Sequence, residues 1–175
     1  DAKSNSKFGS AALNSLTSGC NNTAVGKSAL TANTTGRYNT ATGYNALCSN
    51  TTGERNQAFG ISSLISNTTG SSNQAFGESA LRANTTGICN TALGSYSLYA
   101  NTTGQQNIAV GFGALQKNTI GEKNTATGYL ASCANTTGCF NTAHGFFALN
   151  KNTTASFNAA YGSHSLYCNT TGTLN

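Results

Sequence analysis

Polar and apolar residues recur along this chain with a period of 17. Every seventeenth residue from Asn5 onward is Asn, and the places that follow repeat the same order of small and apolar residues. The unit reads N-T-A-x-G-x-x-A-L-x-x-N-T-T-G-x-x, and ten copies follow one another without an insertion. We number the positions of one copy 1 to 17 and call the residues at one position a column. The ten copies begin at Asn5, Asn22, Asn39, Asn56, Asn73, Asn90, Asn107, Asn124, Asn141 and Asn158.

The constant period predicts a stack of like units. An insertion in one copy would shift every column, so an unbroken period indicates that each copy packs on its neighbours. Seventeen residues are too few for a two-helix repeat, and Gly at positions 5 and 15 beside Thr-Thr is poor helix material. Two strands of about five residues and two turns fit this length. We therefore expect an all-β fold, a parallel β-solenoid of ten coils that is about 48 Å long at ~4.8 Å per coil.

The alternation of side chains predicts which columns face the interior. Column 1 is always Asn and column 5 always Gly, whereas column 3 is Ala except for Lys7 and column 9 is Leu except for Ser132. Column 4 varies, from Phe8 to Thr42. Strand side chains alternate between two faces, and a narrow core of fixed width cannot accept Phe in one coil and Thr in another. We expect columns 1, 3, 5 and 9 inside the solenoid and column 4 outside.

Column 4 is mainly apolar along the whole chain. An exposed apolar stripe of this length is typical of a contact surface. It predicts self-association, as a homotrimer or a bundle of filaments. The alternative is a monomer whose own turns cover the stripe.

The two asparagine columns call for different chemistry. Column 1 predicts a buried ladder in which each amide bonds the amides of the neighbouring coils. Column 12 reads N-T-T-G, which fits a turn in which Asn caps its own backbone and Gly supplies a positive φ. The same triplet is an acceptor motif for N-glycosylation, and acceptors ~4.8 Å apart would carry a dense glycan coat. The candidate acceptors are Asn33, Asn50, Asn67, Asn84, Asn101, Asn135, Asn152 and Asn169 in column 12, with Asn21 in column 17.

Composition narrows the function classes. Only 7% of the residues are charged, and the net charge of +5 comes from cations that stand singly. Single cations are typical of a solvated surface, so we expect no nucleic-acid site. No apolar segment is long enough to span a bilayer or to act as a signal peptide. The missing first Met and the start of an eleventh coil at Asn175 predict that residues 1–175 are one repeat array from a longer fibre.

Cysteines, histidines and acids do not form a recognisable reactive site in the sequence. Cys133 and Cys139 share one coil and are the candidate disulfide among six cysteines, because the others lie in different columns or several coils apart. His144 and His164 occupy different columns without an acid partner, so we expect no metal site and no cofactor. Catalysis needs a base oriented by a third group, and we expect no enzyme. The four acids are scattered, at Asp1, Glu54, Glu78 and Glu122.

The segment Asn22-Thr-Ala-Val-Gly-Lys-Ser-Ala-Leu30 resembles the head repeats of YadA-like trimeric autotransporter adhesins. The whole unit resembles still more the N-T-A-x-G-x-x-A-L-x-x-N-T-T-G arrays of tail-fibre-like and endosialidase-chaperone-containing surface proteins. The resemblance covers all ten repeats and implies a left-handed parallel β-roll, usually trimeric, in stalks and adhesive heads. The adhesin repeat is shorter, because its second turn lacks the N-T-T-G extension.

These observations lead to three functional hypotheses. The first is a structural extracellular fibre or stalk on a cell or virion surface, a rigid rod with or without a glycan coat. The second is an adhesin module that recognises a surface glycan through aromatic residues of column 6, which are Tyr44, Phe112, Tyr129 and Phe146. The third is an ice-binding solenoid that uses the stacked Thr columns 13 and 14.

Overall fold

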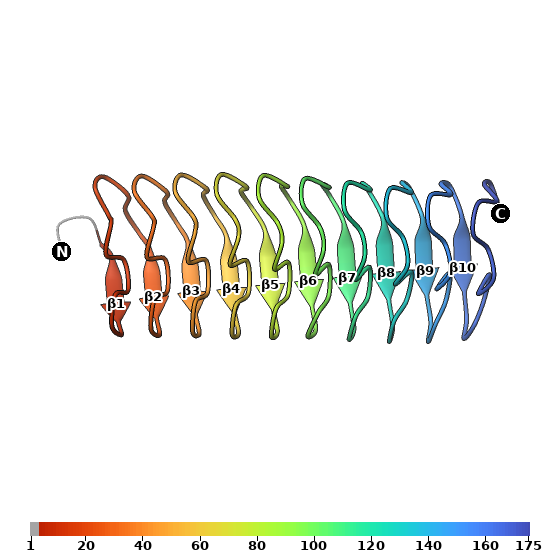
Figure 1. The fold of residues 1–175 in the computed structure, drawn as a ribbon, viewed down its shortest axis with the longest axis horizontal. Coiled ribbons are helices and arrows are strands. Elements are labelled where there is room, and N and C mark those ends of the chain that lie inside the picture. The colour runs from red at the N-terminus through yellow and green to blue at the C-terminus, as the bar shows by residue number, and fades with distance from the viewer. Residues whose placement is uncertain (1–3) are drawn as a thin grey trace.

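The computed structural model describes residues 4–175, which form one elongated solenoid (Figure 1). Ten parallel strands line up in chain order from the N-terminal to the C-terminal end, one strand to each coil. Asp1, one of the four acids, lies outside the described residues. The prediction of an all-β parallel solenoid with 17-residue coils is confirmed.

Each strand occupies positions 2 to 4 of its coil. Neighbouring strands pair in parallel and in register, so that Thr40 lies between Thr23 and Gln57. Column identity in the sequence is therefore adjacency in space. The strands are β1 (Ser6–Phe8), β2 (Thr23–Val25), β3 (Thr40–Thr42), β4 (Gln57–Phe59), β5 (Gln74–Phe76), β6 (Thr91–Leu93), β7 (Ile108–Val110), β8 (Thr125–Thr127), β9 (Thr142–His144) and β10 (Ala159–Tyr161).

The expected second strand of each coil is absent from the described residues. The backbone enters the left-handed region at positions 7 and 9, as at Ser62 (φ 56°) and Leu64 (φ 49°), and again at position 17, as at Arg55 (φ 57°). An extended strand cannot continue through such residues, so the rest of the coil consists of turns. The coils stay bonded there nevertheless, because the Leu64 N–H donates to Ala80 O at 3.0 Å.

The core is a thin column of alanine and leucine. Ala75, Ala80 and Leu81, from columns 3, 8 and 9, are all fully buried, and the same columns are buried in most coils. Their enclosure comes from the coils above and below as well as from their own coil. The interior positions predicted for columns 1, 3 and 9 are confirmed.

Column 5 was expected inside and lies half-buried at the edge of the strand in eight of the ten coils. Gly77 has a φ of 134°, a region that L side chains rarely adopt. A Cβ on Gly77 would also lie 2.7 Å from the carbonyl carbon of Gly94 in the next coil. Glycine is required in column 5 because the backbones of two successive coils approach closely there. The packing of the core does not depend on this column.

Two ladders of asparagine amides run beside the apolar core. In column 1, Asn90 donates its backbone N–H to Asn73 Oδ1 at 3.0 Å and its Nδ2 to Gly104 O at 2.8 Å. In column 12, Asn84 Nδ2 donates to Asn67 Oδ1 at 2.8 Å and to Gly87 O at 3.1 Å. The predicted column 1 ladder is confirmed, and column 12 forms a second one.

The N-T-T-G turn closes as expected, but for a different reason at its glycine. The bond from Asn84 Nδ2 to Gly87 O is the predicted cap of the turn. Gly87 does not adopt a positive φ. A Cβ there would meet Asn84 Oδ1 of its own turn and lie 2.5 Å from Gly104 O in the next coil, so close contacts within the turn and between coils favour glycine in column 15. Coil 9 has Ala155 at this position instead.

Candidate binding surface

The outward face of the sheet is free of charge. Columns 2 and 4 point away from the core and contain no Lys, Arg, Asp or Glu in any of the ten coils. Phe8 is 78% exposed and Leu93 is 42% exposed, which confirms that column 4 faces outward. Phe59 and Phe76 stack in this column with ring centroids 4.8 Å apart and planes 7° from parallel.

Three aromatic residues of column 6 form a continuous stack. The ring centroids of Phe112 and Tyr129 are 5.5 Å apart, as are those of Tyr129 and Phe146, and both pairs are within 16° of parallel. The register of the coils alone produces this stack, because each residue lies one coil beyond the last. Tyr44, the fourth predicted residue, stands apart in coil 3, where the Lys27 ammonium lies 5.9 Å from its ring centroid.

The stack belongs to a larger aromatic cluster on coils 6 to 10. Phe147 of column 7 meets Phe146 edge to face at 4.5 Å, and the His164 ring lies 5.6 Å from Phe147. Tyr167 of column 10 lies 5.5 Å from His164. We call this group the aromatic cluster; its members are Tyr96, Tyr99, Phe112, Tyr129, Phe146, Phe147, His164 and Tyr167.

Sequence reasoning found column 6 and missed columns 7 and 10. Strand alternation would place column 7 on the opposite face, but the left-handed backbone at Phe147 (φ 54°) ends the alternation. The available signal was the recurrence of Tyr, Phe and His at positions 7 and 10 in coils 6 to 10 only. The cluster is therefore a local feature of the C-terminal half.

One acid touches the cluster. The Tyr96 hydroxyl donates to Glu78 Oε1 at 3.1 Å. This hydrogen bond, followed by the negative charge of Glu78, raises the pKa of Tyr96 above its ordinary value. The bond thus connects Glu78 of coil 5 to the first coil of the aromatic cluster.

Most of the candidate glycan acceptors lie inside the solenoid. Their side chains are fully buried, and each Nδ2 in the middle of the ladder donates to two oxygens. A glycan on Nδ2 would replace one of these donors and would need space where the next coil packs. The folded solenoid thus has no room for a glycan at Asn33, Asn50, Asn67, Asn84, Asn101, Asn135 and Asn152.

Two candidate acceptors remain accessible. Asn21 is exposed, and its Nδ2 lies 3.5 Å from Cys20 Sγ. Asn169 is half-buried near the C-terminal end, and its Nδ2 donates to Gly172 O at 2.9 Å. The folded solenoid can therefore carry isolated glycans at Asn21 and Asn169, but no continuous glycan coat along column 12.

All six thiols are free in the structure, so the candidate disulfide is not formed. Cys133 Sγ donates to Gln116 Oε1 at 3.5 Å, whereas Cys139 Sγ accepts from the Glu122 N–H at 3.3 Å. Each thiol thus contacts the preceding coil. Burial raises the pKa of Cys133, against the opposing effect of two nearby lysines.

No metal-binding group of three His, Cys, Asp or Glu occurs among residues 4–175. His144 lies 6.3 Å from the Tyr161 ring on the surface, and His164 belongs to the aromatic cluster. Within the same residues, no helix is long and apolar enough to cross a membrane.

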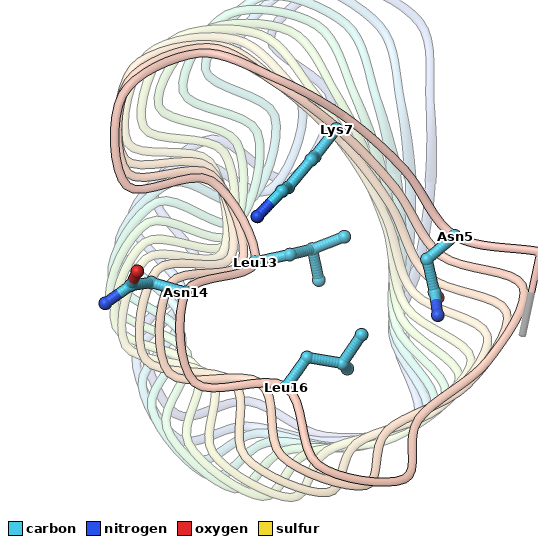
Figure 2. Close-up of a pocket in the computed structure, with 5 residues that line it drawn as sticks. All are labelled: Asn5, Lys7, Leu13, Asn14 and Leu16. Atoms are coloured by element: carbon cyan, nitrogen blue, oxygen red, sulfur yellow. The ribbon is translucent and has the colours of Figure 1, made fainter. Parts of the chain in front are cut away.

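A cavity of about 550 Å³ opens at the N-terminal end of the core (Figure 2). Lys7 replaces the alanine of column 3 and Leu16 the asparagine of column 12, and both side chains point into the opening with Leu13, while Asn14 points away. Coil 1 is the first coil of the described residues, so the cavity lies at that end of the described core column, where Leu13 is still only 4% exposed.

Comparison of the chain with protein-family models, with curated proteins and with solved structures finds no match. The geometry of the solenoid and its surface is therefore the basis for a function.

Proposed function

We propose that this chain is a structural rod, part of an extracellular fibre or stalk on a cell or virion surface. The observation that carries the proposal is the unbroken pair of buried amide ladders. The column 1 ladder alone links Asn5 to Asn175 through hydrogen bonds between successive coils. A rod bonded in this way resists bending, because any bend must lengthen hydrogen bonds on one side.

Labelling of intact native material tests this proposal. Antibodies raised against the array are expected to decorate filaments outside the cell or particle, as seen by immunogold electron microscopy. Labelling confined to the cell interior, under conditions in which a known surface protein is labelled, would overturn it.

Self-association along the sheet face is part of the proposal. Columns 2 and 4 present an uncharged surface with exposed apolar residues such as Val25 and Leu93, which favours contact with another copy. We propose a homotrimer or a bundle of filaments. Analytical ultracentrifugation should give an oligomer that the variant Phe59→Lys with Phe76→Lys converts to monomer; an unchanged mass for this variant would argue against the interface.

The aromatic cluster supports a second candidate, an adhesive module that binds a surface glycan. Phe112, Tyr129 and Phe146 keep between 44% and 47% of their surface exposed although they stack on one another. Aromatic faces and edges are common contacts for sugar rings. Screening on a glycan array with the variant Phe146→Ser tests this role, which fails if wild type and variant give the same pattern.

The threonine columns give less support to ice binding. Most column 13 hydroxyls are occupied, because Thr85 Oγ1 donates to Thr102 O at 3.2 Å, and eight other members from Thr17 to Thr153 repeat this bond. Column 14 alone faces solvent, and it is interrupted by Ile120. A thermal-hysteresis measurement tests whether the single exposed row of column 14 binds ice, and the absence of hysteresis would exclude this function.

A further inference from the structure

Three exposed cations lie in neighbouring columns on coils 5 to 9 of the solenoid. Arg82 belongs to column 10, and Lys117 and Lys151 belong to column 11, in coils 5, 7 and 9. Coils 5, 7 and 9 contain β5, β7 and β9 (Figure 1) and are ~9.6 Å apart, so the three cations recur at alternate coils over ~19 Å along the rod. We call these three residues the cation row.

No acid neutralises the cation row. Columns 10 and 11 contain no Asp or Glu in any coil. Among residues 4–175 there is one ion pair, between Arg55 and Glu54 at 3.5 Å, in columns 17 and 16. Glu78, the acid nearest to Arg82 in the sequence, lies in column 6 and accepts the hydrogen bond from Tyr96. The cation row therefore keeps three uncompensated positive charges.

Aromatic rings stand in the coils between and beyond the cations. The Arg82 guanidinium lies 5.6 Å from the Tyr99 ring centroid, and its Nη1 is 3.4 Å from the Tyr99 hydroxyl. The Lys151 ammonium lies 5.6 Å from the Tyr167 ring centroid. Both tyrosines also belong to the aromatic cluster. The cation row and the aromatic cluster thus form one continuous surface.

The positive charges of Lys117 in coil 7 and Lys151 in coil 9 both act on the thiol of coil 8. Cys133 lies in coil 8 between Lys117 and Lys151, and both ammonium groups act to lower the pKa of its thiol, against the larger effect of burial. Their positive potentials therefore overlap across the intervening coil. An anionic chain that follows the cation row meets a continuous favourable potential.

We propose that the cation row binds a linear acidic polysaccharide that runs along the rod. The spacing suits a polymer that carries a carboxylate on alternate sugars. Tyr99, between Arg82 and Lys117, and Tyr167, one coil beyond Lys151, offer surfaces for neutral sugars. A nucleic acid strand carries a phosphate about every 3.4 Å, and three cations over ~19 Å match that charge density poorly. The site is independent of the fibre role, because it needs only the folded coils 5 to 10.

Binding to immobilised hyaluronate, which has one carboxylate per disaccharide, tests the proposal. Biolayer interferometry at low ionic strength should detect wild-type binding that weakens as salt is added. The variant Lys117→Gln with Lys151→Gln is expected to bind about tenfold more weakly, near the upper range for two exposed charge contacts. Circular dichroism should show that its thermal unfolding is unchanged.

The matched control is Arg55→Gln with Lys123→Gln. These cations also lie over aromatic rings, at 5.5 Å from Tyr38 and 4.9 Å from Phe140, and the net charge falls by the same amount. The control should retain binding within about twofold, as expected for charges outside the site. Equal losses in the two double variants, no binding by wild type, equal binding to neutral dextran, or tighter binding to an oligo(dT) strand would each overturn the proposal.

Discussion

The interior and the exterior of the solenoid obey different rules. Inside, one residue type recurs in coil after coil, because each side chain is enclosed by copies of itself above and below, as Leu81 is by Leu64 and Leu98. Outside, neighbours in a column contact each other without being enclosed, and column 6 changes from Ser95 to Phe112 in one step. Enclosure therefore constrains the interior, whereas the exterior can specialise locally, as it does on coils 6 to 10.

The largest expected effect is at a close backbone contact between coils, in the glycine column 5. Gly77→Ala should lower the free energy of unfolding by about 3–5 kcal/mol, since it combines an unfavourable φ with a Cβ 2.7 Å from backbone of Gly94. Guanidinium denaturation measures the change. Gly162→Ala is the control, because its Cβ would meet nothing within 4 Å. Similar losses in the two variants would contradict this account of column 5.

Leucine truncation compares the two environments directly. Leu81→Ala removes a fully buried side chain and should cost about 2–5 kcal/mol of unfolding free energy. Leu93→Ala, at a side chain that is 42% exposed, should cost less than about 1 kcal/mol. Thermal and denaturant unfolding of both variants measures the two losses of unfolding free energy. Equal losses, or a larger loss for Leu93→Ala, would refute the assignment of column 9 to the interior and column 4 to the exterior.

Breaking one rung of the column 12 ladder should cost about 2–3 kcal/mol. Asn84→Ala removes two donated hydrogen bonds and deprives Asn101 Nδ2 of its acceptor, which lies at 2.9 Å. Hydrogen exchange should show faster opening of coils 5 and 6 than of coil 2. A variant as stable as wild type would mean that these amides contribute nothing to the stack.

The smallest effect has the opposite sign. Ser132 replaces leucine in column 9, and its buried hydroxyl has no hydrogen-bond partner. Ser132→Ala removes the cost of this buried polar group and should raise the free energy of unfolding by about 1 kcal/mol. A higher thermal midpoint would confirm it, and a lower one would show that the hydroxyl is satisfied in solution.

The period of 17 was sufficient to predict the fold, because an array without insertions allows little except stacking. The sequence could not predict the turns of columns 7, 9 and 17. Their left-handed residues are Leu or Ser far more often than Asn, for example Leu64 and Ser62, and only glycine signals a positive φ reliably. Because these left-handed residues could not be recognised in the sequence, a second strand was predicted in each coil where the structure has turns.

The direction of the surface side chains could be predicted within the strands, at positions 2 to 4, but not in the turns that follow them. Column 4 follows from alternation, whereas the aromatic cluster depends on the turn at position 7. The N-T-T triplet fitted both a turn and a glycosylation acceptor, because a local sequence motif does not show whether its asparagine is buried. The recurrence of Asn in column 12 was the better guide, since Asn84 there bonds to Asn67 as Asn90 bonds to Asn73 in column 1.

Both amide ladders point the same way along the rod. Wherever an Nδ2 bonds to the asparagine of a neighbouring coil, it donates toward the N-terminal side, as from Asn101 to Asn84 and from Asn107 to Asn90, so these amide dipoles add as peptide dipoles do in a helix. The rod is therefore a vector with chemically unlike ends. Any longitudinal joint that continues the ladders must be heterologous, head to tail. A two-fold joint would set donor against donor at two N-terminal ends, or acceptor against acceptor at two C-terminal ends.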